Sequence, residues 1–207
     1  MGGGRKDCFP GGDGSTIPPD AYSGTIPVPI YDINGETATI ANVLIEDIIS
    51  GTNTLSYSIQ NPTTFICNPT APYDWYTISG SQNNTLWGAT TKSVYDPCPT
   101  GWHVPQDGTW NDFYDENAPY YILGVQTVTG DYNMTNGRVY KALTWYSSGG
   151  YRTYSNNTLR LVGLNGYWWS STPSDTQSKY FYFFRNAVRP SNLYGRAYGY
   201  SVRCVQE

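Results

Sequence analysis

The sequence predicts a loop-rich domain of the α+β class, in which short strands and large aromatic side chains build the core. The 207 residues include 22 glycines and 14 prolines, which is too many for a helical bundle. They also include 7 Trp, 20 Tyr and 6 Phe, whereas charged residues make up only 14% of the chain. A chain with this many aromatic side chains can bury enough apolar surface to fold.

Charge and hydropathy exclude two further classes of protein. The net charge is −4 at pH 7 and the pI is about 4.9. Proteins that bind DNA or RNA usually carry a basic surface, so we expect no nucleic-acid partner. The chain contains no run of 18 apolar residues, so we expect no transmembrane helix and no membrane insertion.

The first 60 residues divide into a tail and a β-rich segment. Residues 1–20 are rich in Gly, Pro and Asp and are predicted to be flexible; they lack the apolar stretch of a secretory signal peptide. Residues 21–60 follow a β-like pattern, in which Asn34 and Gly35 mark a hairpin turn. Residues 55–60 alternate apolar and polar side chains, which predicts a half-buried strand.

The rest of the chain, residues 61–207, forms the main predicted domain. All seven tryptophans lie here among Asn, Pro, Gly and Ser, which is typical of an aromatic core held by loops. One helix is predicted over residues 105–117, with Asp107 as its N-cap. Its buried face has the spacing i, i+3, i+4 and consists of Trp110, Phe113 and Tyr114.

Three separated segments of this domain resemble one known family. They are KSVYDPCPTGWHVPQDGTWNDF (92–113), GYWWSST (166–172) and GYSVRCVQE (199–207). In this order and spacing they resemble the Fibrobacter-type paralogous domain of Bacteroidetes surface proteins, over about residues 60–207. The resemblance implies a C-type-lectin-like fold, related to the fold of formylglycine-generating enzymes. In such a fold the last strand returns beside the early elements, so Cys98 and Cys204 could pair; two free buried thiols are the alternative.

Residues 166–204 are the most aromatic part of the chain. Within them the run KYFYFFRNAVRP reads as a strand, whose side chains alternate between two faces. One face carries Tyr180, Tyr182 and Phe184, and the other carries Phe181, Phe183 and Arg185. If the first set belongs to the core, the second faces a partner or water. A strand with large aromatic side chains on both faces is either buried on both sides or presents a binding surface.

The same segment resembles the variable region of proteins that are diversified by retroelements and built on a C-type-lectin-like fold. In that family variation enters through adenines, often in Asn codons, and the scaffold residues between variable positions stay apolar or aromatic. The composition, Tyr with Ser, Gly, Asn and scattered Arg, is also that of antibody recognition loops. The resemblance implies eleven variable, ligand-binding positions: Phe181, Phe183, Arg185, Asn186, Ala187, Arg189, Asn192, Leu193, Tyr194, Gly195 and Tyr198.

This resemblance implies a ligand-binding protein without enzymatic activity. Its partner would be a protein or a glycan on another cell or virion, and the protein itself would lie outside the cell, on a bacterial or phage surface. A fixed surface or fimbria-associated binding module is the alternative. Four side chains distinguish these two alternatives: Phe181, Phe183, Arg185 and Tyr194. Their exposure to solvent would favour the variable protein, and their burial would favour the fixed module.

Catalytic and metal chemistry find little support in the sequence. There is one histidine, His103, and no CxxC pair, so we expect no catalytic residue, no metal site and no cofactor. Residues 110–112 spell the Trp-Asn-Asp tripeptide of calcium-dependent lectins, but they lie far from the chain end, where the lectin tripeptide is found. A formylglycine-generating type of enzyme is the remote alternative, and it would need a reactive, accessible thiol at Cys67 or Cys204.

Overall fold

The computed structural model describes residues 3–12, 28–88, 90–121, 137–184 and 186–207. Over these ranges the chain is rich in strands and loops, and it contains two short helices, α1 (Ile45–Ile48) and α2 (Leu55–Gln60). Neither helix in the described part of the chain has the length or apolarity needed to cross a lipid bilayer. The loop-rich, strand-containing part of the α+β prediction is confirmed, and helix is limited to these two short elements in the described ranges.

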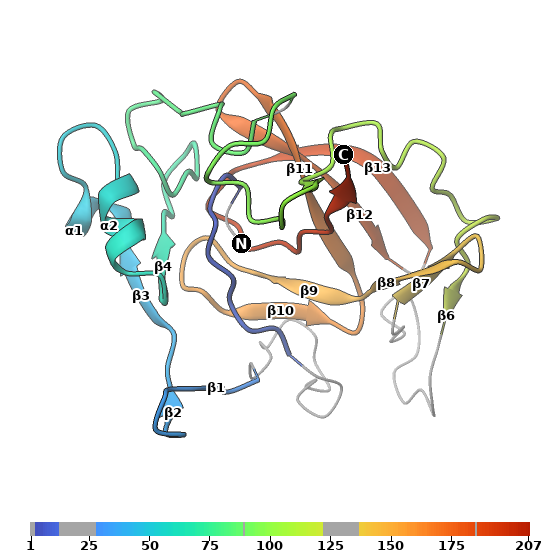
Figure 1. The fold of residues 1–207 in the computed structure, drawn as a ribbon, viewed down its shortest axis with the longest axis horizontal. Helices are drawn as coiled ribbons and strands as arrows, with labels where there is room; N and C mark the ends of the chain where they lie inside the picture. The colour runs from blue at the N-terminus through green and yellow to red at the C-terminus, as the bar shows by residue number, and fades with distance from the viewer. Residues whose placement is uncertain (1–2, 13–27, 89, 122–136, 185) are drawn as a thin grey trace.

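The largest sheet is antiparallel and is made by consecutive strands near the C-terminus. Its order is β11-β12-β13, and Figure 1 shows the three long strands side by side. The register is irregular on both sides of β12, between Trp169 and Pro173 and between Tyr180 and Tyr182. The strands are β11 (Gly166–Ser174), β12 (Gln177–Phe184) and β13 (Ala187–Tyr194).

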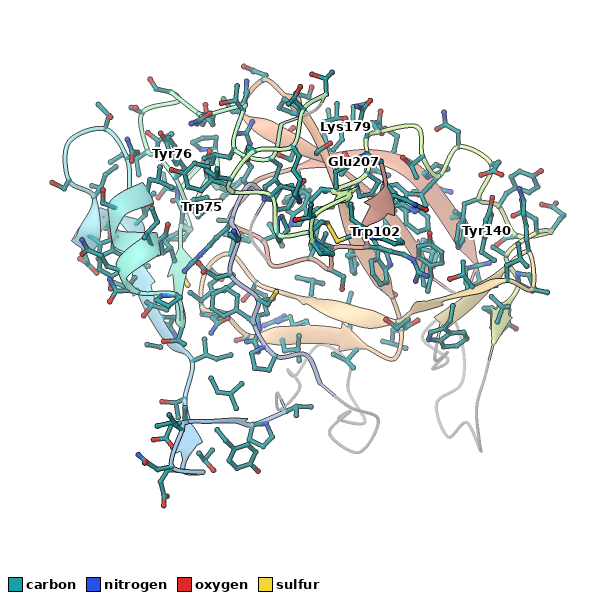
Figure 2. The ribbon with its side chains drawn as sticks, viewed as in Figure 1. Trp75, Tyr76, Trp102, Tyr140, Lys179 and Glu207 are labelled. Atoms are coloured by element: carbon teal, nitrogen blue, oxygen red, sulfur yellow. A yellow bond between two sulfur atoms is a disulfide. The ribbon has the colours of Figure 1, made fainter. Side chains whose placement is uncertain are left out.

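Small antiparallel sheets pack around this sheet. One is the pair β9 (Gly149–Arg152) and β10 (Leu159–Val162). Another has the order β6 (Tyr120–Tyr121), β7 (Gly137–Tyr140) and β8 (Thr144–Ser147). A third pairs β5 (Trp102–His103) with the C-terminal β14 (Val205–Gln206). Close to the third sheet, Cys98 and Cys204 form a disulfide, which is the yellow bond in Figure 2.

The segment before residue 61 is β-rich only in part. The hairpin at Asn34–Gly35 is confirmed, because β1 (Ile30–Tyr31) pairs with β2 (Thr37–Ala38) and Gly35 takes the positive φ of +81° that the turn requires. Strand β3 (Ala41–Leu44) pairs in parallel with β4 (Thr64–Cys67), so strand pairing joins residues on both sides of the boundary at 60/61.

Two predicted elements are wrong. Residues 55–60, predicted as a strand, form helix α2, and Asn53 Oδ1 just before the helix accepts the Leu55 N–H at 3.0 Å. The predicted helix over 105–117 is a series of turns. Gly108 there has φ +97°, which a helix cannot accommodate. Turns still bring two of the three aromatic residues into the core, since Trp110 is 2% and Phe113 1% exposed.

Residues 3–12, called the N-terminal segment below, lie against the domain instead of forming the flexible tail that the sequence predicts. The indole N–H of Trp75 donates to the carbonyl of Gly3 at 2.9 Å. Arg5 is 3% exposed, and the ring of Phe9 meets that of Phe65 edge to face at 5.2 Å. In Figure 1 the segment crosses the front of the molecule toward β9 and β10.

Candidate functional site

The two faces of the β11-β12-β13 sheet are packed differently. Paired residues of antiparallel neighbours project to the same face. Trp168 is opposite Phe181, and both side chains project to one face; Tyr167 is opposite Tyr182, and both project to the other. The strand therefore alternates as predicted, and the question is which face is covered.

The face that carries Phe181 and Phe183 is buried. Both rings are 0% exposed. The ring of Phe181 stacks on Trp110 at 5.1 Å and lies 4.7 Å from that of Phe113. The prediction that these two residues face a partner is wrong, because the turns over 105–117 cover this side of the sheet. Alternation fixes which residues share a face, and the packing of distant segments decides which face is core.

The opposite face is only partly covered. Near Trp169 and Tyr180 it is closed by Tyr200, whose ring lies 4.4 Å and 5.0 Å from theirs. Further along β12 the side chains of Tyr182 and Phe184 stay half-buried. Their rings are nearly parallel, 6.1 Å apart at 15°.

Strand β13 adds polar and aromatic groups to the same side. Arg189 lies opposite Tyr182, and Ala187 opposite Phe184. Arg189 is exposed. Tyr194 is 40% exposed and meets Tyr198 edge to face at 4.8 Å. We call this surface the open face, and it consists of Tyr167, Tyr182, Phe184, Ala187, Arg189, Asn192 and Tyr194.

A group of tyrosines supports the open face from its closed end. Tyr198 lies between Tyr194 and Tyr154, with ring centroids 4.8 Å and 4.7 Å away. Burial raises the pKa of Tyr167, Tyr180 and Tyr198 well above the ordinary range of a phenol. These hydroxyls therefore stay protonated in neutral solution and act as neutral hydrogen-bonding groups.

The structure divides the eleven predicted ligand-binding residues. The open face brings together Ala187, Arg189, Asn192 and Tyr194. Asn186 is exposed and lies beside the open face. Leu193 is 39% exposed, but it pairs with Lys179 and therefore projects to the opposite face of the sheet. Arg185 lies outside the described residues. The remaining four residues are buried: Phe181, Phe183, Gly195 and Tyr198.

Gly195 has a structural reason to be glycine. A Cβ at this position would lie 2.5 Å from the Cβ of Tyr73 and 2.9 Å from the carbonyl oxygen of Pro72. Any other residue would push the loop before Trp75 away from the end of β13. The assignment of Gly195 to the variable positions is therefore wrong.

Arg196 holds the segment just after β13 in place, and no pattern in the sequence predicted this role. The side chain is 4% exposed and donates to the carbonyls of Gln177 at 3.1 Å and Asn83 at 3.3 Å. Burial lowers the pKa of Arg196, and the buried carboxylate of Asp74 opposes this shift. Its own carbonyl accepts the N–H of Gly3 at 2.9 Å, which links the N-terminal segment to the open face.

The structure places two of the cysteines and the tripeptide acid that the sequence singled out. Cys67 is 1% exposed, and burial raises the pKa of its thiol to about 11. Cys204 is held in the disulfide with Cys98. Asp112, in the Trp-Asn-Asp tripeptide, pairs with Lys141 at 2.6 Å. The described ranges contain no group of three or more His, Cys, Asp or Glu residues that could hold a metal ion.

Comparison of the chain with protein-family models, with curated proteins and with solved structures finds no significant match.

Proposed function

We propose that the protein is a ligand-binding protein with a C-type-lectin-like scaffold, diversified by a retroelement, and that the open face is its recognition surface. The observation that carries the proposal is the composition and exposure of that face. Half-buried aromatic rings lie beside an exposed arginine and a tyrosine that is 40% exposed. Tyr and Arg are the residue types that dominate the energetics of protein interfaces.

The burial of individual side chains revises the list of variable positions. Six positions fit a recognition surface, and each holds an amino acid that an Asn codon reaches by changing adenines. Phe181, Phe183 and Gly195 belong to the scaffold, because replacing them would disrupt the core or the loop beside it. The six positions are Tyr182, Phe184, Ala187, Arg189, Asn192 and Tyr194.

The residue types of the open face favour a protein as the ligand over a glycan. Neighbouring rings are nearly parallel, Tyr167 to Tyr182 at 12° and Tyr182 to Phe184 at 15°, with centroids 5.7 Å and 6.1 Å apart. Aromatic residues and arginine are enriched in the cores of protein interfaces, and tyrosine adds a hydroxyl that can form a hydrogen bond with the partner.

The cysteines agree with a binding protein outside the cell. The disulfide between Cys98 and Cys204 suits an oxidising compartment, such as a bacterial or virion surface. Cys67 lacks both the access and the thiolate character of a catalytic cysteine, so the formylglycine-generating alternative finds no support in its surroundings.

A fixed surface or fimbria-associated module is the second candidate. The burial of Phe181 and Phe183 favours it, since a diversified protein was expected to expose them. The exposure of Arg189 and Tyr194 favours the diversified protein.

Sequencing the gene in many individuals of its source population, with the DNA beyond its 3′ end, separates the two candidates. Diversification predicts a near-copy of the codons for residues 166–204 beside a reverse transcriptase gene. It also predicts differences at the six revised positions and constancy at Phe181 and Phe183. An invariant gene without such a copy would refute diversification and leave the open face as a fixed binding surface.

A further inference from the structure

Arg152, at the end of β9, is a buried cation that has no charge partner among the residues that the structure describes. It is 5% exposed, and among the described residues no Asp or Glu oxygen lies within 4.0 Å of its guanidinium. Its hydrogen-bond acceptors are neutral: Asn157 accepts from Nη1 at 2.9 Å and 3.0 Å, and the Pro10 carbonyl accepts from Nη2 at 2.6 Å. Burial lowers its pKa only to about 10, so it is charged in neutral solution.

The other buried arginines differ from Arg152 in this respect. Arg5 pairs with Asp7 at 2.7 Å, Arg138 pairs with Asp115 at 2.7 Å, and Arg196 feels the charge of Asp74. A buried charge without a counter-charge is costly, and proteins normally pair it.

A cavity of about 460 Å³ lies beside Arg152. Its walls come from the N-terminal segment, from the main chain of Gly149, Gly150 and Gly199, and from the aromatic side chain of Trp168. Two N–H groups of lining residues have no hydrogen-bond partner within the described part of the chain, namely Nε of Arg152 and Nε1 of Trp168. The cavity therefore combines an uncompensated positive charge with unused donors and an aromatic wall.

We propose that this cavity binds a small molecule that carries one carboxylate and an apolar body. The bonds to Asn157 and Pro10 use at most three of the five guanidinium N–H groups of Arg152. Nε and Nη2 lie side by side on one edge of a guanidinium, the edge that binds carboxylates in bidentate pairs. One carboxylate balances the single charge, whereas a phosphate dianion would exceed it.

Entry of the ligand requires a local shift. The free N–H groups of Arg152 and Trp168 have almost no surface open to water. The carboxylate binds Arg152 after the N-terminal segment shifts and the hydrogen bond from Arg152 to the Pro10 carbonyl breaks. Binding at this cavity is independent of the open face.

Thermal unfolding with two matched probes tests the proposal. Phenylacetate and phenylacetamide share an aromatic body and differ in charge, and both are added at equal ionic strength. The melting temperature rises with phenylacetate concentration, as it does for any ligand that binds the folded state. The amide produces less than a third of that rise.

Two variants and one control locate the effect in the cavity. A Cβ at Gly149 would lie 3.7 Å from Ser201 Oγ and 3.8 Å from Ser147 Oγ, two lining residues, at ordinary contact distance. The Cβ is therefore accommodated, and the larger side chain of Gly149→Val is expected to occupy the cavity and to abolish the rise in melting temperature. Arg152→Gln removes the preference for the acid over the amide. The matched control Arg160→Gln removes an arginine of β10 that does not line the cavity. This control is expected to show the same rise in melting temperature with phenylacetate as the wild type.

The proposal is overturned by any of three results: no rise with phenylacetate, equal rises with acid and amide, or an unchanged rise in Gly149→Val. Because Gly149→Val retains every contact of Arg152, the test stands even where Arg152→Gln fails to fold. Failure of this test leaves the proposed function of the open face untouched.

Discussion

Replacing Phe181 with alanine tests the packing that separates the buried from the open face. The Phe181 ring is 0% exposed and contacts the rings of Trp110, Phe113 and Tyr146, with centroids 5.1, 4.7 and 5.9 Å away. Removing such a ring loses its transfer free energy and leaves a cavity, which together cost about 3–5 kcal/mol. For a domain of this size the loss corresponds to a fall in melting temperature of about 6–20 °C.

Phe184→Ala is the matched control, because it makes the same chemical change three residues further along the same strand. The Phe184 ring is half-buried, and among the described residues its one aromatic ring neighbour is Tyr182. Water fills the space that it leaves, so we expect a cost of about 1 kcal/mol.

Urea unfolding of the wild type and the two variants, followed by tryptophan fluorescence, gives the two free-energy differences directly. Phe181→Ala is expected to be the more destabilising by at least about 2 kcal/mol. Equal costs, or a larger cost for Phe184→Ala, would refute the assignment of the buried face.

Three further predictions concern titration and sulfur chemistry. Burial raises the pKa of Asp74 to about 6, so the folded state binds the carboxyl proton of Asp74 more tightly than the unfolded state does. The stability that this protonated carboxyl contributes is complete below about pH 4 and falls by about 3 kcal/mol as the pH rises through 6. Urea unfolding at pH 4 and pH 7 should show this fall in the wild type relative to Asp74→Asn, and parallel curves would contradict it. The disulfide between Cys98 and Cys204 joins residues 106 positions apart, so the variant with both cysteines replaced by alanine should lose about 2–5 kcal/mol of unfolding free energy in the same assay. An unchanged urea midpoint would argue against the disulfide. In the native protein a thiol reagent at pH 7 should label the exposed Cys8 rapidly and Cys67 only after unfolding. Cys67 is 1% exposed, and burial raises the pKa of its thiol to about 11. Equal labelling rates for the two cysteines would contradict the burial of Cys67.

The features that the sequence predicted correctly are local. The hairpin at Asn34–Gly35 depends on turn chemistry within a few residues, and the structure has it. The alternation of β12 follows from strand geometry alone, and it places Phe181 and Phe183 on one face and Tyr182 on the other.

The features that it missed depend on distant contacts. The six residues 55–60 alternate as a strand would, yet they form helix α2, because an alternating pattern this short does not decide between a strand and a helix. The choice of buried face depends on turns 70 residues earlier, which contribute Trp110. Arg196 donates hydrogen bonds both to the nearby Gln177 and to Asn83, more than 100 residues away, and no spacing in the sequence predicts the distant contact.

The central claim is that the open face is a recognition surface that tolerates change. Two displayed libraries test it most directly, one randomised at Tyr182, Phe184, Arg189 and Tyr194, the other at the buried Phe181, Phe183 and Gly195. Resistance of each displayed variant to protease measures the folded fraction of each library. The account predicts that most members of the first library stay folded and yield binders to unrelated proteins, while few members of the second fold. Equal folded fractions, or a first library that unfolds as the second does, would contradict it.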